Sequence, residues 1–239
     1  MLGLFPRRHR GADVRNMEIT RTPDGCTVFP GSPHVDRVLL EYDTGRCTVF
    51  FSDGRTSSFV RTWENYHVYM YGLHFSDDGK IMFTGDWRKG LFAIDPHNGE
   101  TIWHYRPPRI RAIFAFPGYL IALRDGRSVI KLDVRTGELL GEITGRSLVS
   151  CWLLDGRHVL LDSKGGKLCV VDTESMETVK RYGIRGMHSS VNPNNCLSLV
   201  IRDARLEEGK LIICGFEEYP NRDYSAACSV EFVRELEWL

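Results

Sequence analysis

Residues Leu91 to Trp103 read LFAIDPHNGETIW, and two later stretches repeat this pattern without gaps. The repeats are Val129–Gly141, VIKLDVRTGELLG, and Leu168–Lys180, LCVVDTESMETVK. Each has an apolar run, an Asp, a four-residue turn and a second apolar run. The Asp anchors at positions 95, 133 and 172 lie 38 and 39 residues apart. A fixed period of this length is the signature of a repeat architecture.

Each Asp anchor is typical of a hairpin between two strands, because Asp caps the N–H groups of a turn and Gly supplies a positive φ. Between the anchors, IFAF, YLIAL and SVIKLD (113–116, 119–123 and 128–133) alternate with short turns such as Pro117-Gly118. Four short strands in about 40 residues make one propeller blade. We therefore predict an all-β fold, a β-propeller of about five four-stranded antiparallel blades, with four or six blades as alternatives.

The repeat also sets approximate boundaries. We expect a tail over 1–15 and one propeller domain over 16–239, with blades at 16–51, 67–106, 110–144, 148–183 and 187–238. The first blade contains a looser copy of the pattern, Leu39–Phe51, with Asp43 and Gly45 at its turn, and 52–66 is expected to be a longer connection. The segment Ser229–Leu239 either completes the last blade or pairs with N-terminal residues, because an open ring leaves unpaired strand edges.

Ala93, Asp95, Gly99 and Trp103 fit the pattern A-x-D-x-x-x-G-x-x-x-W. In this the segment resembles the tryptophan-docking motif of PQQ-like, or quinoprotein-type, propellers. The resemblance implies a scaffold in which the motif packs one blade against the next. The dehydrogenases of that family are much longer and hold PQQ and a calcium ion, for which this chain lacks ligands, so we expect no cofactor and no metal. WD40 is the competing repeat type, but its Gly-His and Trp-Asp signatures are missing.

Composition narrows the class of protein further. Lys plus Arg and Asp plus Glu both number 31, so the net charge of zero offers no global attraction to nucleic acid or membranes. The seven cysteines form no C-x-x-C pair, which favours unpaired thiols in a reducing compartment. The sequence has no apolar run long enough to span a bilayer and no signal peptide, so a cytoplasmic protein is expected. No G-x-S-x-G, H-E-x-x-H or P-loop pattern occurs, and we expect no enzyme activity.

The strand order sorts the loops onto two faces. Connections between blades and turns between second and third strands share one face, which is rich in Arg and Lys, whereas acidic residues predominate in the turns of the other. An aromatic residue in a turn suggests an interface anchor. The predicted partner-binding residues are Trp87, Arg88, Arg106, Arg109, Arg124 and Arg127, with Trp63 and Tyr66 at the edge.

These observations favour a protein-binding platform or partner-specific inhibitor that recognises an acidic protein surface. Three alternatives stay open. The charged turn residues can simply be solvated, the propeller can be a small-ligand enzyme of lactonase-like or glycan-acting type, or its basic face can bind nucleic acid.

Overall fold

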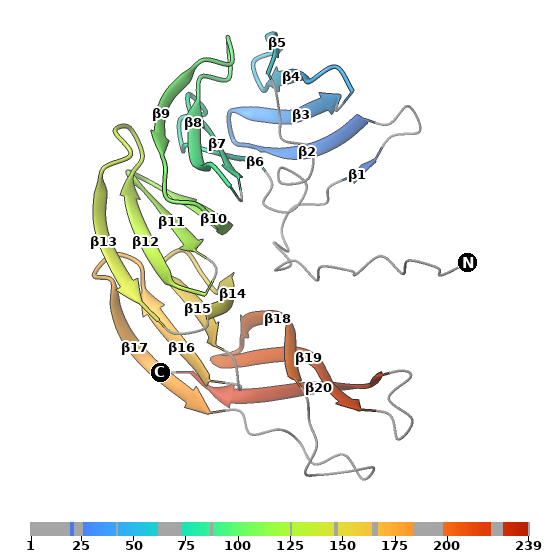
Figure 1. Ribbon diagram of the computed structural model, residues 1–239, viewed down its shortest axis with the longest axis vertical. Helices are drawn as coiled ribbons and strands as arrows, with labels where there is room; N and C mark the ends of the chain where they lie inside the picture. The colour runs from blue at the N-terminus through green and yellow to red at the C-terminus, as the bar shows by residue number, and fades with distance from the viewer. Residues whose placement is uncertain are drawn as a thin grey trace.

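The computed structural model describes residues 20–21, 26–41, 43–61, 73–86, 88–124, 126–145, 148–163, 167–183, 198–220 and 227–238. Every regular element in these ranges is a β-strand, and the strands form five antiparallel sheets (Figure 1). No helix in the described ranges is long and apolar enough to cross a membrane.

The first sheet contains β1 (Thr20–Arg21), β2 (Cys26–Ser32), β3 (Val35–Glu41), β4 (Arg46–Phe51) and β5 (Thr56–Val60). The second contains β6 (Leu73–Phe75), β7 (Met82–Asp86), β8 (Gly90–Ile94) and β9 (Thr101–Tyr105). The third contains β10 (Ile110–Phe116), β11 (Tyr119–Arg124), β12 (Ser128–Asp133) and β13 (Leu139–Thr144). The fourth contains β14 (Leu148–Leu153), β15 (His158–Ser163), β16 (Lys167–Asp172) and β17 (Glu177–Gly183). The last contains β18 (Ser198–Glu207), β19 (Lys210–Pro220) and β20 (Ala227–Glu237).

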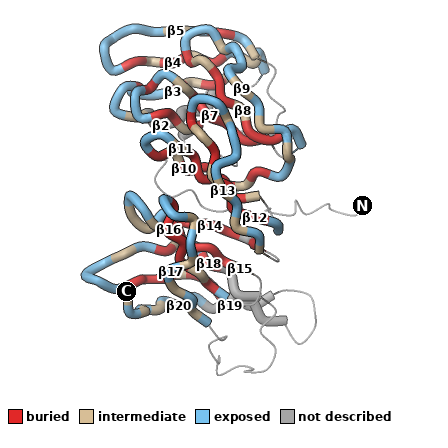
Figure 2. The backbone as a smooth tube through the Cα atoms, turned by 90° about the vertical axis from the view of Figure 1, so that its left-hand side faces the viewer, coloured by how far each residue is buried: buried red, intermediate tan, exposed pale blue. Residues whose placement is uncertain are grey.

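The sheets follow one another around an arc, with β6, β10, β14 and β18 on its inner side and β9, β13 and β17 on its outer side (Figure 1). This arrangement confirms the predicted all-β propeller and its count of five blades. The first and last sheets lie at opposite ends of the arc. Buried residues run along the strands while the turns are exposed, so the core is divided into layers between neighbouring blades (Figure 2).

The hairpin anchors work as the sequence predicts. The carboxylate of Asp133 accepts the backbone N–H groups of Arg135 and Thr136, both at 2.8 Å. Asp95 and Asp172 cap their turns in the same way. These bonds satisfy backbone donors that the reversal of the chain leaves without ladder partners.

Tryptophan docking is confirmed between the second and third blades. The Trp103 Nε1–H donates to the Val134 carbonyl at 3.0 Å. A Cβ atom at Gly137 would lie 2.6 Å from the Trp103 ring, so only glycine fits beneath it. At the interface between the third and fourth blades, the large and the small residue change places. Gly141 stands where Trp is expected, and Met176 fills the space opposite, with its Cγ 3.2 Å from a Cβ placed on Gly141.

The interface between the fourth and last blades shows which strand position β20 occupies in its blade. Lys180 occupies the place of Trp103, because Val170 pairs with Lys180 as Ala93 pairs with Trp103. The Lys180 ammonium group donates to the carbonyl of Trp238 at 3.1 Å. In the same way, Trp103 donates to Val134, which directly follows β12, the third strand of the next blade. β20 is therefore the third strand of the last blade, which has three described strands instead of the predicted four.

Two predictions about the first blade are wrong, its end and its hairpin anchor. The first blade extends to Val60, because β5 is a genuine strand that pairs with β4. Only Phe59 of its five residues is buried, so its polar sequence resembles a connection. The turn at Asp43–Gly45 joins the second and third strands, counting from β2, and the true anchor is Asp53, whose carboxylate accepts the Arg55 N–H at 3.0 Å. The C-terminal segment pairs with β19 and so belongs to the last sheet.

Candidate partner-binding face

Antiparallel order places the β7–β8 turn, the β9–β10 connection and the β11–β12 turn at one end of the sheets. We call this end the arginine face, and the exposed bases in these three segments are Arg88, Lys89, Arg106, Arg109 and Arg127. The hairpins between first and second strands and between third and fourth strands lie at the opposite end, the hairpin face. The topology thus brings four of the five predicted arginines, Arg88, Arg106, Arg109 and Arg127, to one face as exposed residues.

The β9–β10 connection, Arg106-Pro107-Pro108-Arg109, holds two exposed arginines on a stiff backbone. Proline fixes φ, and Arg109 itself has φ of 70°, a left-handed conformation that costs a non-glycine residue roughly 1–2 kcal/mol. The β7–β8 turn lies against this connection, since a Cβ on Gly90 would overlap the Tyr105 carbonyl and lie 2.9 Å from that of Pro107. The two arginines are therefore presented by a fixed backbone.

The β11–β12 turn is held just as firmly. The Gly126 N–H donates to the Leu148 carbonyl at 2.9 Å, and the Arg127 carbonyl accepts the Gly145 N–H at 2.8 Å. Both bonds tie the turn to the end of its own blade and the start of the next. In the described part of the chain, no side-chain hydrogen bond or ion pair holds Arg106, Arg109 or Arg127.

Arg124 differs from the other predicted arginines. Its side chain is only 14% exposed and lies 3.4 Å from the Glu142 carboxylate of β13. Burial raises the pKa of the nearby Tyr105 phenol, an effect that the Arg124 charge opposes. Arg124 is thus engaged in a contact within the fold, which the sequence did not indicate.

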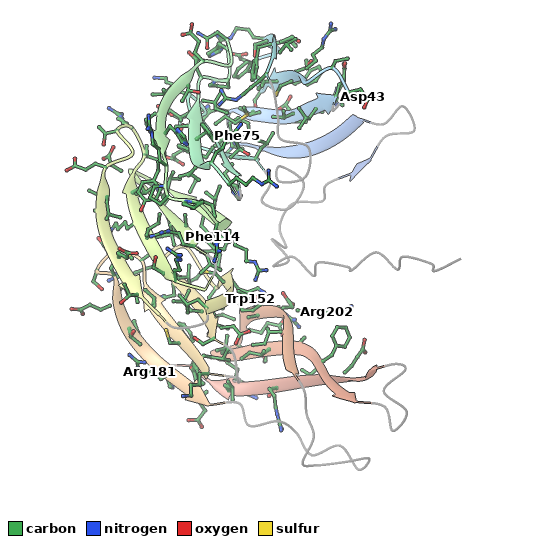
Figure 3. The ribbon with its side chains drawn as sticks, in the orientation of Figure 1. Asp43, Phe75, Phe114, Trp152, Arg181 and Arg202 are labelled. Carbon is green, nitrogen blue, oxygen red and sulfur yellow. The ribbon has the colours of Figure 1, made fainter. Side chains whose placement is uncertain are left out.

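The remaining predicted partner-binding residues, Trp87, Trp63 and Tyr66, lie outside the described residues. Another base, Arg202, lies within β18 (Figure 3), and its guanidinium covers the Phe216 ring at 3.7 Å. Arg205 also lies in β18, in ion pairs with Glu207 and Asp203.

The acidic residues of the hairpin face are used by the fold. Hydrogen bonds from Thr136 and Arg135 lower the pKa of Asp133, and the Ser76 hydroxyl and Lys80 do the same for Asp78. Asp172 is buried and bonds the Arg157 guanidinium at 2.6 Å. These Asp residues thus serve as turn caps and in local ion pairs. Glu217 and Glu218 lie within β19 and not in a hairpin of this face.

One groove on the hairpin face bears on the small-ligand alternative. It holds about 410 Å³ between the first two blades and is lined by residues that include Phe51, Arg55, Asp95 and His97. The His97 ring stacks on Phe51 at 4.6 Å between centroids. Among the described side chains, no group of three or more His, Cys, Asp or Glu is placed to hold a metal ion.

Comparison with known proteins supports the fold. No protein-family model matches the sequence, and no curated protein matches it. Among solved structures, BamB from Moraxella catarrhalis is similar, with a TM-score of 0.59 and 16% sequence identity. The match covers 91% of this chain and 63% of the BamB chain. BamB is a PQQ-like β-propeller, so the similarity confirms the propeller fold that the repeat predicts.

Proposed function

We propose that this propeller is a protein-binding platform that docks an acidic protein surface on its arginine face. The observation that carries the proposal is the Arg106-Pro107-Pro108-Arg109 connection, in which two exposed arginines stand on a backbone fixed by two prolines and by the neighbouring turn. The similarity to BamB supports a propeller scaffold of a kind that commonly binds proteins.

Preorganisation is the physical reason to favour these arginines. A guanidinium group presents a planar fork that matches a carboxylate with two parallel hydrogen bonds. Ordering a flexible loop on binding costs free energy, and a loop that is already fixed avoids that cost. The arginine face therefore offers directed donors where a partner needs only to supply carboxylates.

The distribution of charge also supports an acidic partner on the arginine face. The chain is neutral as a whole, and several carboxylates of the hairpin face already accept turn N–H groups or form an ion pair. The exposed positive charges of Arg106, Arg109 and Arg127 are left to act on approaching molecules. Such a local excess raises the rate of encounter with an acidic surface and disfavours basic ones.

We expect the double variant Arg106→Glu/Arg109→Glu to lose most partner binding, because it reverses the charge of the fixed loop. The immobilised parent and variant chains are exposed to lysate of the native host, and the proteins retained by the parent are quantified by mass spectrometry. The matched control is Glu100→Lys/Glu138→Lys, which reverses two exposed charges in hairpins of the other face and should retain the partner. Added salt should weaken retention mainly by slowing association.

The same experiment separates the alternatives. Loss of binding in the Glu100/Glu138 variant with full binding in the arginine variant would move the interface to the hairpin face. Release of all retained protein by nuclease would favour nucleic-acid binding. Turnover of a lactone or glycan by the purified chain would favour the enzyme.

A further inference from the structure

The last blade is built differently from the other four. Its strands β18, β19 and β20 have 10, 11 and 11 residues, whereas no other described strand has more than seven. β20 takes the third strand position and, within the described residues, pairs only with β19. A long strand with an open edge is a template for the addition of another strand.

The ladder shows which backbone groups face this edge. Trp238 N–H donates to the Gly209 carbonyl at 3.3 Å, across the pair Glu237–Lys210. Because N–H and C=O groups alternate along a strand, those of Glu231, Val233 and Glu235 point away from β19. The Glu237 carbonyl points the same way, since it accepts the Tyr182 hydroxyl at 2.9 Å.

The side chains beside this edge are mainly acidic. Glu231, Glu235 and Glu237 are exposed, and Val233 between them is 63% exposed. Lys210 of β19 bonds Glu235 at 2.7 Å and offsets one of the three charges. Leu236 faces the fourth blade instead and packs in the core between the last two sheets. The open edge thus combines free backbone groups with a row of carboxylates around one apolar residue.

We propose that the outer edge of β20 binds an extended, basic protein segment as the fourth strand of the last blade. Cross-strand neighbours of opposite charge stabilise a pair of strands, and like charges oppose it. The complementary strand therefore has Lys or Arg, an apolar residue, and Lys or Arg at alternate positions. A second copy of this edge would set Glu beside Glu, so charge argues against self-pairing. Because β17 already holds the Glu237 carbonyl, the added strand pairs with residues 229–235.

The test uses the full chain and two synthetic peptides, Thr-Lys-Thr-Val-Thr-Lys-Thr and its counterpart with Glu in place of Lys. Binding is followed by fluorescence anisotropy to about 1 mM peptide, and backbone amide exchange is recorded with and without peptide. We expect the Lys peptide to bind and to slow exchange at Glu231, Val233 and Glu235. The amides of Arg234 and Leu236, which already face β19, should not change.

Val233→Pro removes one outward donor at an edge position, where proline is tolerated, and should weaken the Lys peptide by about tenfold. Val60→Pro is the matched control. Val60 is 70% exposed, and its N–H faces outward from β5, because the next residue, Arg61, donates to the Gly45 carbonyl. Glu231→Lys/Glu235→Lys should reverse the preference in favour of the Glu peptide. Absence of saturable binding, equal binding of both peptides, or equal loss in the two proline variants would overturn the proposal.

Discussion

Replacing Trp103 with alanine is expected to lower the free energy of unfolding by about 3 kcal/mol. The ring is half-buried, packs over Gly137 and tilts against Phe83 with centroids 5.9 Å apart. Truncation removes these contacts and leaves the Val134 carbonyl without its 3.0 Å donor. Chemical denaturation of the purified variant measures the loss. Arg88→Ala, in an exposed turn, should change stability by about 0.5 kcal/mol or less.

A double-mutant cycle isolates the docking contact. Gly137→Ala in the parent should be costly for two reasons, since Gly137 has φ of 71° and its added Cβ would meet the Trp103 ring. In the Trp103→Ala background only the cost of positive φ remains, about 1–2 kcal/mol. The two substitutions should therefore be strongly non-additive. Additive losses would mean that Trp103 does not dock the second blade on the third.

The second large effect concerns pH. Asp162 of β15 is 5% exposed, and burial raises the pKa of its carboxyl to about 7. Its pKa in the unfolded chain is about 3.9, so between about pH 4 and pH 7 the folded state binds the extra proton. Stability from this group is present below pH 4 and is lost as the pH rises to 7. The loss amounts to as much as about 4 kcal/mol, since each pKa unit is worth about 1.4.

Asp162→Asn removes the ionisable group while keeping its size. The variant should match the parent near pH 4 and should be the more stable protein near pH 8, as measured by urea denaturation across that range. Asp133→Asn serves as the control with the opposite sign. Hydrogen bonds lower the pKa of Asp133, so it stabilises the fold at neutral pH and loses that contribution only in acid. An Asp162→Asn variant whose stability runs parallel to that of the parent would show that this carboxyl is not destabilised by burial.

The parts of the fold that could be predicted are those with a local cause. Asp95, Asp133 and Asp172 mark hairpins because the turn itself needs the carboxylate, and the spacing of the anchors then gives the blade. β5 could not be found in this way, because it has one buried residue. The last blade shows no such anchor in its described residues, because the anchor lies between third and fourth strands and this blade has no described fourth strand.

The arginine face likewise has residues that could be predicted from local sequence and contacts that could not. Loop order alone places Arg106, Arg109 and Arg127 together, because antiparallel strands alternate in direction. The ion pair of Arg124 with Glu142 depends on how β11, β12 and β13 align, and this pairing of distant residues leaves no local pattern. The exchange of sizes at Gly141 and Met176 is likewise visible only in three dimensions.

Amide exchange of the chain with and without its captured protein partner tests the binding account most directly. The account predicts slower exchange at Arg106 and Arg109 and in the β11–β12 turn, with the hairpins anchored by Asp53, Asp95 and Asp133 unchanged. Protection confined to those hairpins, with the arginine face exchanging as in the free chain, would contradict it.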